Sequence, residues 1–411
     1  MSTFTRKLCS NERLWVAVER LNPSFCSQLC VSGDGRIELT RLEHAVQVAS
    51  QANPGSRLHL RGHLWFSRWV DSGRTPPIEV IDGSAWDGWS PQGLDFQQTF
   101  RPRAGPTSGV IVLEGEPQRL IFRSLHATMD GAGLLTWMED IFRVLRDEPP
   151  IGAMNSISDV ELAKELKNGF QQPPVHAECL SPLGAVRPRT PPWEMSFDWR
   201  RIRLEGPVHN LLGRVIRVVA DEAFWRADEE GIEGPDLVRV SVPVDMRRHH
   251  GNLRSTSNLT SGVFVAVDRT TTIEEIKASV RQQIADRRDL DLVLLLRRMV
   301  FVPLSVVCSY IKKDGPRAHL KARYASSATV STLGKLSLDR YRCPGFDTRE
   351  LFVVPSTGGV DGCPLTVALA GAEGAIDIAL TASRAHASEG RLEQLARTLD
   401  ATLREAVDSS G

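Results

Sequence analysis

Residues 124–133 read Ser124-Leu-His126-Ala-Thr-Met-Asp130-Gly131-Ala-Gly133 and form the most informative segment of the chain. Before it stand two runs rich in strand-forming residues, 109–113 and 119–125, and the turn residues of 114–117 join them into a predicted hairpin. After it, apolar residues recur at helical spacing over 134–145. The pattern therefore places His126 where a strand ends and a helix is about to begin.

His126, Asp130 and Gly131 form the pattern HxxxDG, which suits acid–base chemistry. A histidine titrates near neutral pH, so it can take a proton from a hydroxyl or an amine when its ring is held in one orientation. Asp130 can provide that order in two ways, by bonding the imidazole directly or by fixing the loop through an ion pair. Gly131 suits a tight loop that a substrate approaches closely. The competing interpretation is an ordinary loop histidine, with Asp130 only capping the next helix.

Both halves of the chain mix strands with amphipathic helices. Capping-box patterns predict helices that open at Thr40, Ser158 and Thr272. Apolar and alternating runs predict strands over 58–66, 237–244, 261–268, 365–370 and 375–382, with a closing helix from 388. Six of the 24 prolines fall within 173–192 and predict an extended connector. We expect an N-terminal lobe over 1–172 that carries the motif, a connector over 173–194 and a C-terminal lobe over 195–411.

Composition excludes several classes of protein. Fifty basic and fifty acidic residues give no net charge, so the chain as a whole lacks the excess that nucleic acids or anionic bilayers attract. Seven cysteines without paired CxxC spacing favour neither a disulfide framework nor a zinc site. The first 22 residues carry several charges and no apolar core, which is untypical of a secretory signal. We therefore expect a cytoplasmic protein with reduced thiols and with neither nucleic acid nor membrane as a partner.

Other segments admit weaker hypotheses. His59 and His63 have a spacing that could bind metal, but a polar strand face explains them better, so no metal is expected. Residues 247–250 read Arg-Arg-His-His and could hold an anion, although a structural Arg247 in a solvated loop is the simpler interpretation. The most apolar stretch, 290–311, is broken by charges and a proline and predicts a buried element rather than a membrane span. Four tryptophans could line a substrate channel or only fill the core: Trp65, Trp69, Trp86 and Trp89.

The stretch 124–133 resembles the active-site motif of the chloramphenicol acetyltransferase and condensation-domain superfamily. Three later segments resemble this superfamily in the expected order. They are Val242-Pro-Val-Asp-Met-Arg247, Ala328-Thr-Val-Ser331-Thr332-Leu-Gly334 and the closing strand, strand and helix from Leu365. The resemblance implies a mixed α/β fold in which two chloramphenicol-acetyltransferase-like lobes form a V with the active-site channel between them. It also implies that Arg247 pairs with Asp130.

The resemblance further implies acyl transfer with His126 as general base. The donor would be an acyl thioester of coenzyme A or of a phosphopantetheinyl carrier protein acting in trans, and no bound cofactor is implied. The acceptor would be a hydroxyl or an amine of a small metabolite. Candidate donors to the tetrahedral oxyanion are Ser331, Thr332 and Gly334, together with backbone N–H groups near Gly131.

The sequence also departs from the superfamily pattern. Leu125 stands where many members carry a first histidine, Thr332 stands in place of the commoner asparagine, and the plant-type DFGWG signature is absent. Two rivals to acyl transfer stay open. One keeps the fold and changes the chemistry to cyclisation or C–C bond formation, and the other is a non-catalytic module that binds a carrier protein.

Overall fold

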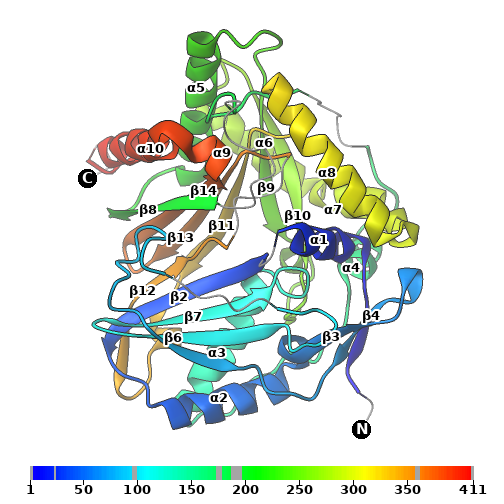
Figure 1. The fold of residues 1–411 in the computed structure, drawn as a ribbon, viewed down its shortest axis with the longest axis vertical. Helices are drawn as coiled ribbons and strands as arrows, with labels where there is room; N and C mark the ends of the chain where they lie inside the picture. The colour runs from blue at the N-terminus through cyan, green and yellow to red at the C-terminus, as the bar shows by residue number, and fades with distance from the viewer. Residues whose placement is uncertain are drawn as a thin grey trace.

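The protein, represented by a computed structural model, is described over residues 3–22, 25–94, 100–172, 178–186, 197–356 and 362–408. It has two lobes, each built on a mixed sheet with helices packed on one face (Figure 1). The predicted mixed α/β class and the two lobes are confirmed. The predicted hairpin is β6 (Ser108–Glu114) and β7 (Gln118–Leu125), and α3 (Gly131–Leu145) follows it.

The first lobe contains a five-stranded sheet in the order β12-β2-β7-β6-β5. Its remaining strands are β12 (Phe346–Val353), β2 (Cys26–Gly35) and β5 (Ile78–Asp82). The helices α2 (Leu39–Ala52) and α3 cover one face, because both present apolar stripes that join the strands in one core. A three-stranded sheet completes the lobe with β1 (Thr5–Lys7), β4 (Arg68–Asp71) and β3 (Leu58–Arg61).

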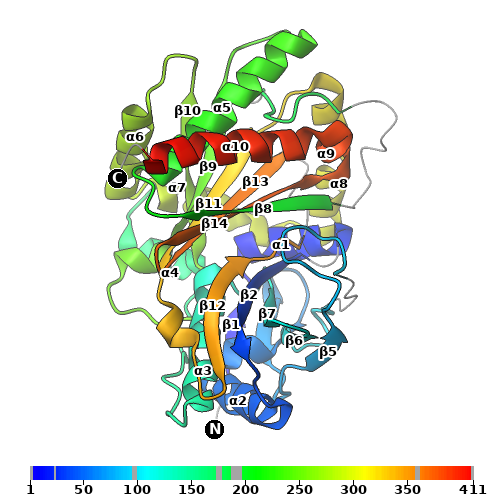
Figure 2. The ribbon, with the colours of Figure 1, turned by 90° about the vertical axis from the view of Figure 1, so that its left-hand side faces the viewer.

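The second lobe contains a six-stranded sheet in the order β10-β9-β11-β13-β14-β8. Its strands are β10 (Thr260–Val267), β9 (Val238–Asp245), β11 (Ala328–Leu336), β13 (Leu365–Ala372), β14 (Ala375–Ser383) and β8 (Phe197–Glu205). Figure 2 shows α10 lying across this sheet. One face packs on α5 (Leu211–Glu230), α6 (Ile273–Ala285) and α10 (Arg391–Asp408). The opposite face is therefore free to border a site between the lobes.

Several helices lie where the lobes meet. There α1 (Ser10–Leu21) packs against α7 (Asp289–Leu296), the 3-10 helix η4 (Arg297–Phe301) and α8 (Leu304–Lys321), and α4 (Asp159–Leu166) packs against α7. The remaining short helices are η1 (Pro54–Arg57), η2 (Leu64–Phe66), η3 (Met246–His249), η5 (Leu338–Tyr341), α9 (Arg384–Ala387) and η6 (Ser388–Gly390).

The predicted boundary does not account for one strand. β12 comes from the C-terminal part of the chain but pairs antiparallel with β2, so it belongs to the sheet of the first lobe (Figure 2). Of the predicted connector, residues 178–186 are described: Leu180 and Leu183 join the core of the second lobe. The rest of the connector, 173–177 and 187–194, lies outside the described residues.

Two sequence predictions about helices need correction. The capping boxes of Ser158 and Thr272 form as predicted, but α2 begins at Leu39 and Thr40 instead donates to the carboxylate of Glu38. The apolar stretch 290–311 is not one buried element, because Pro303 separates α7 and η4 from α8 and residues such as Phe301 are exposed. Within the described ranges no single helix has the length and apolar character to cross a membrane. Asp289–Phe301 and Leu304–Lys321 meet that test only as a pair bent by 119°.

Candidate active site

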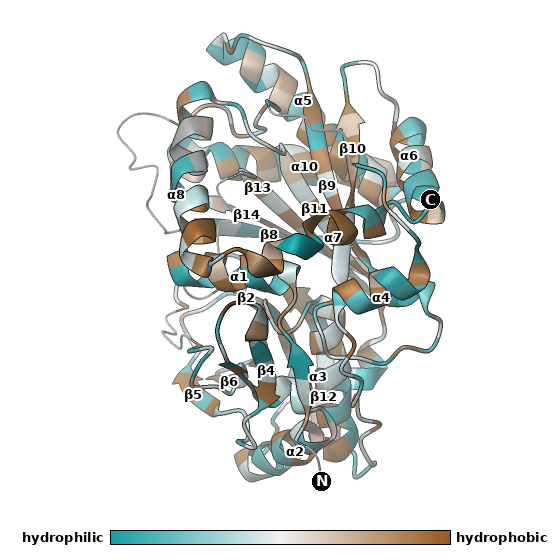
Figure 3. Ribbon diagram, turned by 90° about the vertical axis from the view of Figure 1, so that its right-hand side faces the viewer, coloured by the Kyte–Doolittle hydropathy of each residue, from teal (hydrophilic) through white to brown (hydrophobic). Residues whose placement is uncertain are grey.

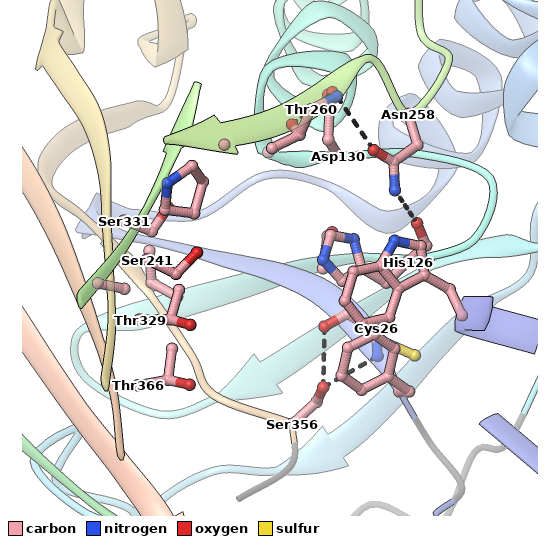
Figure 4. A pocket seen from close by; sticks show the side chains of 18 of the residues that line it. Cys26, His126, Asp130, Ser241, Asn258, Thr260, Thr329, Ser331, Ser356 and Thr366 are labelled. Carbon is pink, nitrogen blue, oxygen red and sulfur yellow. Dashed lines mark hydrogen bonds between the residues drawn. The ribbon is translucent and has the colours of Figure 1, made fainter. Parts of the chain in front are cut away.

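The loop from His126 to Asp130 is held by backbone contacts from several elements. The N–H of His126 donates to the carbonyl of Phe25 over 3.0 Å. Asn258 Nδ2 donates to the carbonyl of His126 over 2.6 Å (Figure 4). On the far side of the loop, Arg6 Nη2 donates to the carbonyl of Thr128 over 2.9 Å. The loop is therefore ordered by the protein itself.

The imidazole of His126 is fixed in one tautomer by Ser27. Register pairing of β2 with β7 sets Ser27 beside the end of β7, and its Oγ lies 3.0 Å from His126 Nδ1. The same hydroxyl donates to the carbonyl of Met129 over 3.0 Å, so its oxygen accepts from Nδ1–H. Among the described residues Nε2 has no hydrogen-bond partner. Nε2 is therefore the nitrogen that is free to accept a proton.

Two aromatic rings lie against the imidazole in a largely apolar setting, and they also stack on each other, with the centroids of Trp15 and Phe25 5.1 Å apart. Trp15 of α1 stacks on His126 with ring centroids 5.3 Å apart and an interplanar angle of 18°. Phe25 lies 5.1 Å from the imidazole centroid at 38°. Burial lowers the pKa of His126 below its ordinary value of 6.5, although the carboxylate of Asp130 opposes the shift. The ring is therefore neutral at pH 7, as a general base requires.

Asp130 is bound to the second lobe rather than to the imidazole. Its oxygens lie 3.0 and 3.1 Å from Nη1 and Nη2 of Arg247, and it accepts bonds from Leu259 N and Thr260 Oγ1 as well. It also caps α3 by accepting from Gly133 N over 2.7 Å. Burial alone would raise the pKa of Asp130, but Arg247 and the N–H donors outweigh burial and lower it.

These contacts decide between the two roles that the sequence left open for Asp130. The direct bond to the imidazole is absent, and the ion pair that braces the loop is present. Both side chains are almost fully enclosed, with 1% of Asp130 and 10% of Arg247 exposed. The guanidinium makes further bonds to Asp245 and to the carbonyls of Ser255 and Ser257. The pairing implied by the resemblance is therefore present in the structure.

Gly131 lies at a close contact between the lobes, where a side chain would force the end of Leu333 to shift, and its backbone conformation is ordinary. It is the first residue of α3, and a Cβ added to it would lie 2.6 Å from Cδ2 of Leu333. Leu333 belongs to β11 of the second lobe. The glycine therefore lets the start of α3 approach the opposite lobe.

His126 faces a cavity of 420 Å³ that both lobes line. This volume is within the range of small-molecule sites. Figure 4 shows His126 on one side and hydroxyl side chains on the other. These hydroxyls come from neighbouring strands of the six-stranded sheet: Ser241, Thr329, Ser331, Thr366 and Thr381. The remaining lining is mainly apolar, with Leu14, Trp15, Leu292, Val293 and Val353 among it.

The three residues predicted near the oxyanion separate in the structure. Ser331 lines the cavity. Thr332 and Gly334 do not, because successive side chains of a strand point to opposite faces. The hydroxyl of Thr332 instead accepts a bond from Gly334 N over 3.1 Å. Of these three predicted residues, Ser331 is the one positioned to meet a ligand.

Asp159 is a cavity residue that sequence reasoning missed. It is the first residue of α4 and only 1% exposed. One oxygen accepts from Val160 N, and within the described part of the chain the group nearest to the rest of the carboxyl is the thiol of Cys9, a weak donor. Burial raises the pKa of Asp159 from 3.8 to about 7. Of the two aspartates that line the cavity in the described ranges, Asp130 is fully engaged and Asp159 is not.

The other sequence hypotheses find no support at the cavity. Trp69 and Trp86 are buried in cores, whereas Trp65 and Trp89 are exposed, so none of the four lines it. His59 Nε2 accepts from Arg61 Nε. No group of three or more His, Cys, Asp or Glu side chains in the described ranges is arranged to hold a metal ion.

Thr329, which sequence reasoning missed, left a local signal that it shares with the predicted Ser331. Thr329 and Ser331 alternate with the core residues Ala328 and Val330 along β11. Polar residues at alternate positions of an apolar strand indicate a face that does not belong to the core. Ser27, Trp15 and Asp159 left no such signal, because they reach His126 or the cavity only through the tertiary fold.

The sequence matches no protein-family model and no curated protein. Solved structures do resemble the fold over nearly the whole chain. A variant of the starter condensation domain of rhizomide synthetase RzmA, in complex with C8-CoA and Leu-SNAC, has a TM-score of 0.64 at 14% identity, over 98% of this chain and 95% of that one. TRI101 of F. graminearum, complexed with coenzyme A and deoxynivalenol, has a TM-score of 0.62 at 12% identity, over 95% and 98%.

A third similar structure is the epimerization domain from the third module of tyrocidine synthetase B. It has a TM-score of 0.58 at 12% identity and covers 100% of this chain and 98% of its own. At these identities the likeness concerns the fold. The chain therefore has the two-lobed fold that condensation domains share with chloramphenicol-acetyltransferase-like proteins.

Proposed function

We propose that this chain, built on the condensation-domain fold, is an acyltransferase that moves an acyl group from a thioester to a hydroxyl or an amine of a small metabolite. The observation that carries the proposal is the state of His126. Its Nδ1 is anchored by Ser27, no described residue bonds its Nε2, and its ring faces a cavity between the lobes. This is the arrangement that a general base in an acyl transfer needs.

The reaction follows from that geometry. Nε2 of His126 takes the proton of the acceptor, and the acceptor oxygen or nitrogen attacks the thioester carbonyl carbon. The oxyanion of the tetrahedral intermediate receives a hydrogen bond, for which the hydroxyl of Ser331 is our candidate donor. Collapse of the intermediate breaks the C–S bond, and the departing thiolate receives the proton from Nε2–H. The products are an ester or amide and a free thiol.

The thioester donor is acyl coenzyme A or an acylated carrier protein. Two similar structures, the RzmA domain and TRI101, are complexes with C8-CoA and with coenzyme A. This favours testing coenzyme A thioesters first. The mainly apolar wall of the cavity, interrupted by strand hydroxyls, suits an acyl chain beside a polar acceptor.

The decisive experiment incubates the protein with octanoyl-CoA and pools of amine and alcohol acceptors. Free thiol and product mass are followed together, with His126→Gln as the matched variant. Acyl transfer predicts equal amounts of thiol and acylated product that depend on His126. Product without thiol would favour a different reaction on the same fold, such as cyclisation or C–C bond formation. The similarity to an epimerization domain is a reason to test for such a reaction. Neither product nor thiol with coenzyme A thioesters or acylated carrier proteins, but stable binding of a carrier protein, would favour the binding module.

A further inference from the structure

One edge of the molecule exposes a group of large apolar side chains. Phe66 is 71% exposed, Tyr310 69%, Phe301 60% and Trp65 49%. The group belongs to η2, η4 and the start of α8, and we call it the aromatic edge: Leu64, Trp65, Phe66, Phe301, Val306 and Tyr310. Exposed apolar side chains that cluster in this way mark a surface that meets another apolar phase.

The three rings that η2 and η4 contribute to the aromatic edge contact one another. The ring centroid of Trp65 lies 5.3 Å from that of Phe66 and 6.0 Å from that of Phe301. Val306 and Tyr310 are four residues apart on α8 and therefore share one face of that helix. Figure 3 shows hydrophobic segments at α1, at α7 and at the beginning of α8 close to one another.

A buried arginine holds the two halves of the aromatic edge in place. Arg13 of α1 is 2% exposed. Its Nη1 donates to the carbonyl of Leu64 over 3.0 Å, and its Nη2 donates to the carbonyl of Val302 over 2.7 Å. These bonds tie η2 to the end of η4, so the exposed rings are presented on a defined scaffold.

Basic residues predominate in the segments that carry the aromatic edge, and the acidic residues nearest to these segments in sequence are Asp71, Asp291 and Asp314. Segments 61–68 and 295–313 contain basic residues and no acidic residue. Arg68, Arg298, Lys312 and Lys313 are exposed. Zero net charge over the chain conceals this local excess, because the compensating acidic residues lie elsewhere in the sequence.

The aromatic edge adjoins the candidate active site through two helices. α1 carries Arg13, which supports the edge, and Trp15, which stacks on His126. α7 lines the cavity with Leu292, Val293 and Leu296 and continues directly into η4. A surface bound at the edge would therefore lie against the same helices that wall the cavity.

We propose that the aromatic edge docks the protein on an anionic lipid bilayer. Aromatic rings beside lysines and arginines suit the boundary between headgroups and acyl chains, where the rings enter the apolar layer and the cations meet anionic lipids. This is binding to the membrane surface, and it requires no helix that crosses the bilayer. It departs from the expectation based on net charge, because a local patch binds the membrane independently of the chain's total charge.

The test measures binding of the full chain to lipid vesicles by flotation, so it needs no turnover and does not depend on the proposed acyl transfer. Vesicles are phosphatidylcholine alone or with about one third phosphatidylglycerol. Wild-type protein should bind the anionic vesicles, bind neutral ones at least about tenfold more weakly, and dissociate as salt is raised.

Two variants separate the apolar and the charged contributions. Trp65→Ser with Phe301→Ser should lower the partition coefficient on anionic vesicles about tenfold or more. Lys312→Glu with Lys313→Glu should remove the preference for anionic lipid. Phe66→Ser, at the most exposed position of the edge, is the milder replacement if the double serine variant fails to fold.

Matched controls lie on other faces of the molecule. Trp225→Ser changes an exposed tryptophan on α5, and Arg384→Glu with Arg397→Glu reverses two exposed charges on α9 and α10. α10 lies on the side opposite α8 in Figure 1, and α9 contacts the C-terminal end of α8 through His386 and His319, not the start of α8 that carries the edge. Both controls should bind like wild type. Equal binding to neutral and anionic vesicles, or equal loss in the controls, would overturn the proposal. Dimerisation that disappears in the Trp65 and Phe301 variant would show instead that the edge is an interface between copies.

Discussion

Arg247 and Asp130 form a two-point ion pair across the lobes, with Nη1 3.0 Å from Oδ2 and Nη2 3.1 Å from Oδ1. The same carboxylate caps α3 and accepts the N–H of Leu259. Asp130 therefore connects the lobe that carries His126 to the lobe whose six-stranded sheet lines the cavity with hydroxyl side chains. Loss of this ion pair should displace His126 and leave its side chain intact.

The first prediction concerns this ion pair. Asp130→Ala or Arg247→Ala leaves a buried charge without its partner, which typically costs about 3–5 kcal/mol. Because the two residues act as one unit, the double variant should be little worse than either single one. A double-mutant cycle on the free energy of unfolding and on turnover measures the coupling. Arg247→Lys keeps the positive charge but loses the two-point geometry of the guanidinium, so its stability and turnover should lie between those of wild type and Arg247→Ala. Fully additive effects of the two alanine substitutions would contradict the bracing role.

His126 should be required for turnover and not for folding. His126→Gln keeps the size of the side chain and should lower kcat by about 10²–10⁴. Because burial lowers the pKa of His126, kcat/KM should rise on an acid limb with a midpoint below 6.5 and stay level to pH 8. His44→Gln on the exposed surface of α2 is the control and should behave as wild type. An acid limb centred above pH 7 would contradict the lowered pKa.

Ser27 should act as a positioning residue. Without its hydroxyl the Nδ1–H tautomer of His126 loses its nearest acceptor, and we expect kcat of Ser27→Ala to fall about tenfold to a hundredfold. Ser27→Thr retains the hydroxyl and should restore most of the rate. Nitrogen-15 spectra of the histidine rings provide a readout that mere destabilisation would not change. A wild-type tautomer distribution in Ser27→Ala would refute this role.

Asp159 should make the protein less stable as pH rises. Its carboxyl has a pKa of 3.8 when exposed and about 7 in the fold. Below pH 3.8 both states are protonated, and between 3.8 and 7 only the unfolded state ionises, so stability falls over this interval and then levels off. Asp159→Asn removes this penalty and should add roughly 1–3 kcal/mol above pH 7, with little change at pH 4.

The control for Asp159 is another acidic residue at the start of a helix. Glu274 lies exposed in the first turn of α6, so Glu274→Gln tests the effect of losing a favourable charge at a helix N-terminus. It should lower stability by about 0.3–1 kcal/mol, opposite in sign to Asp159→Asn. Denaturant unfolding from pH 4 to 8 compares both. Destabilisation of Asp159→Asn at pH 8 would show that the carboxylate has an unseen favourable partner.

The local features of this protein were determined by its sequence alone. The hairpin β6–β7, the start of α3 after Asp130 and the capping boxes of Ser158 and Thr272 all follow from patterns within about a dozen residues. The periodicity of apolar residues and the needs of unpaired backbone N–H groups at a helix start act over that length. For that reason neighbouring residues suffice to place the HxxxDG motif between a strand and a helix.

Contacts between distant segments were decided only by the tertiary structure. Ser27 reaches His126 over 99 positions and Arg247 reaches Asp130 over 117, and the return of β12 to the first lobe follows from strand pairing that no local pattern records. The chain sums its charges to zero, yet folding gathers the basic segments 61–68 and 295–313 on one edge. The physical reason is that propensity and capping depend on neighbours in sequence, whereas a tautomer, a buried ion pair or a surface patch depends on which elements pack together.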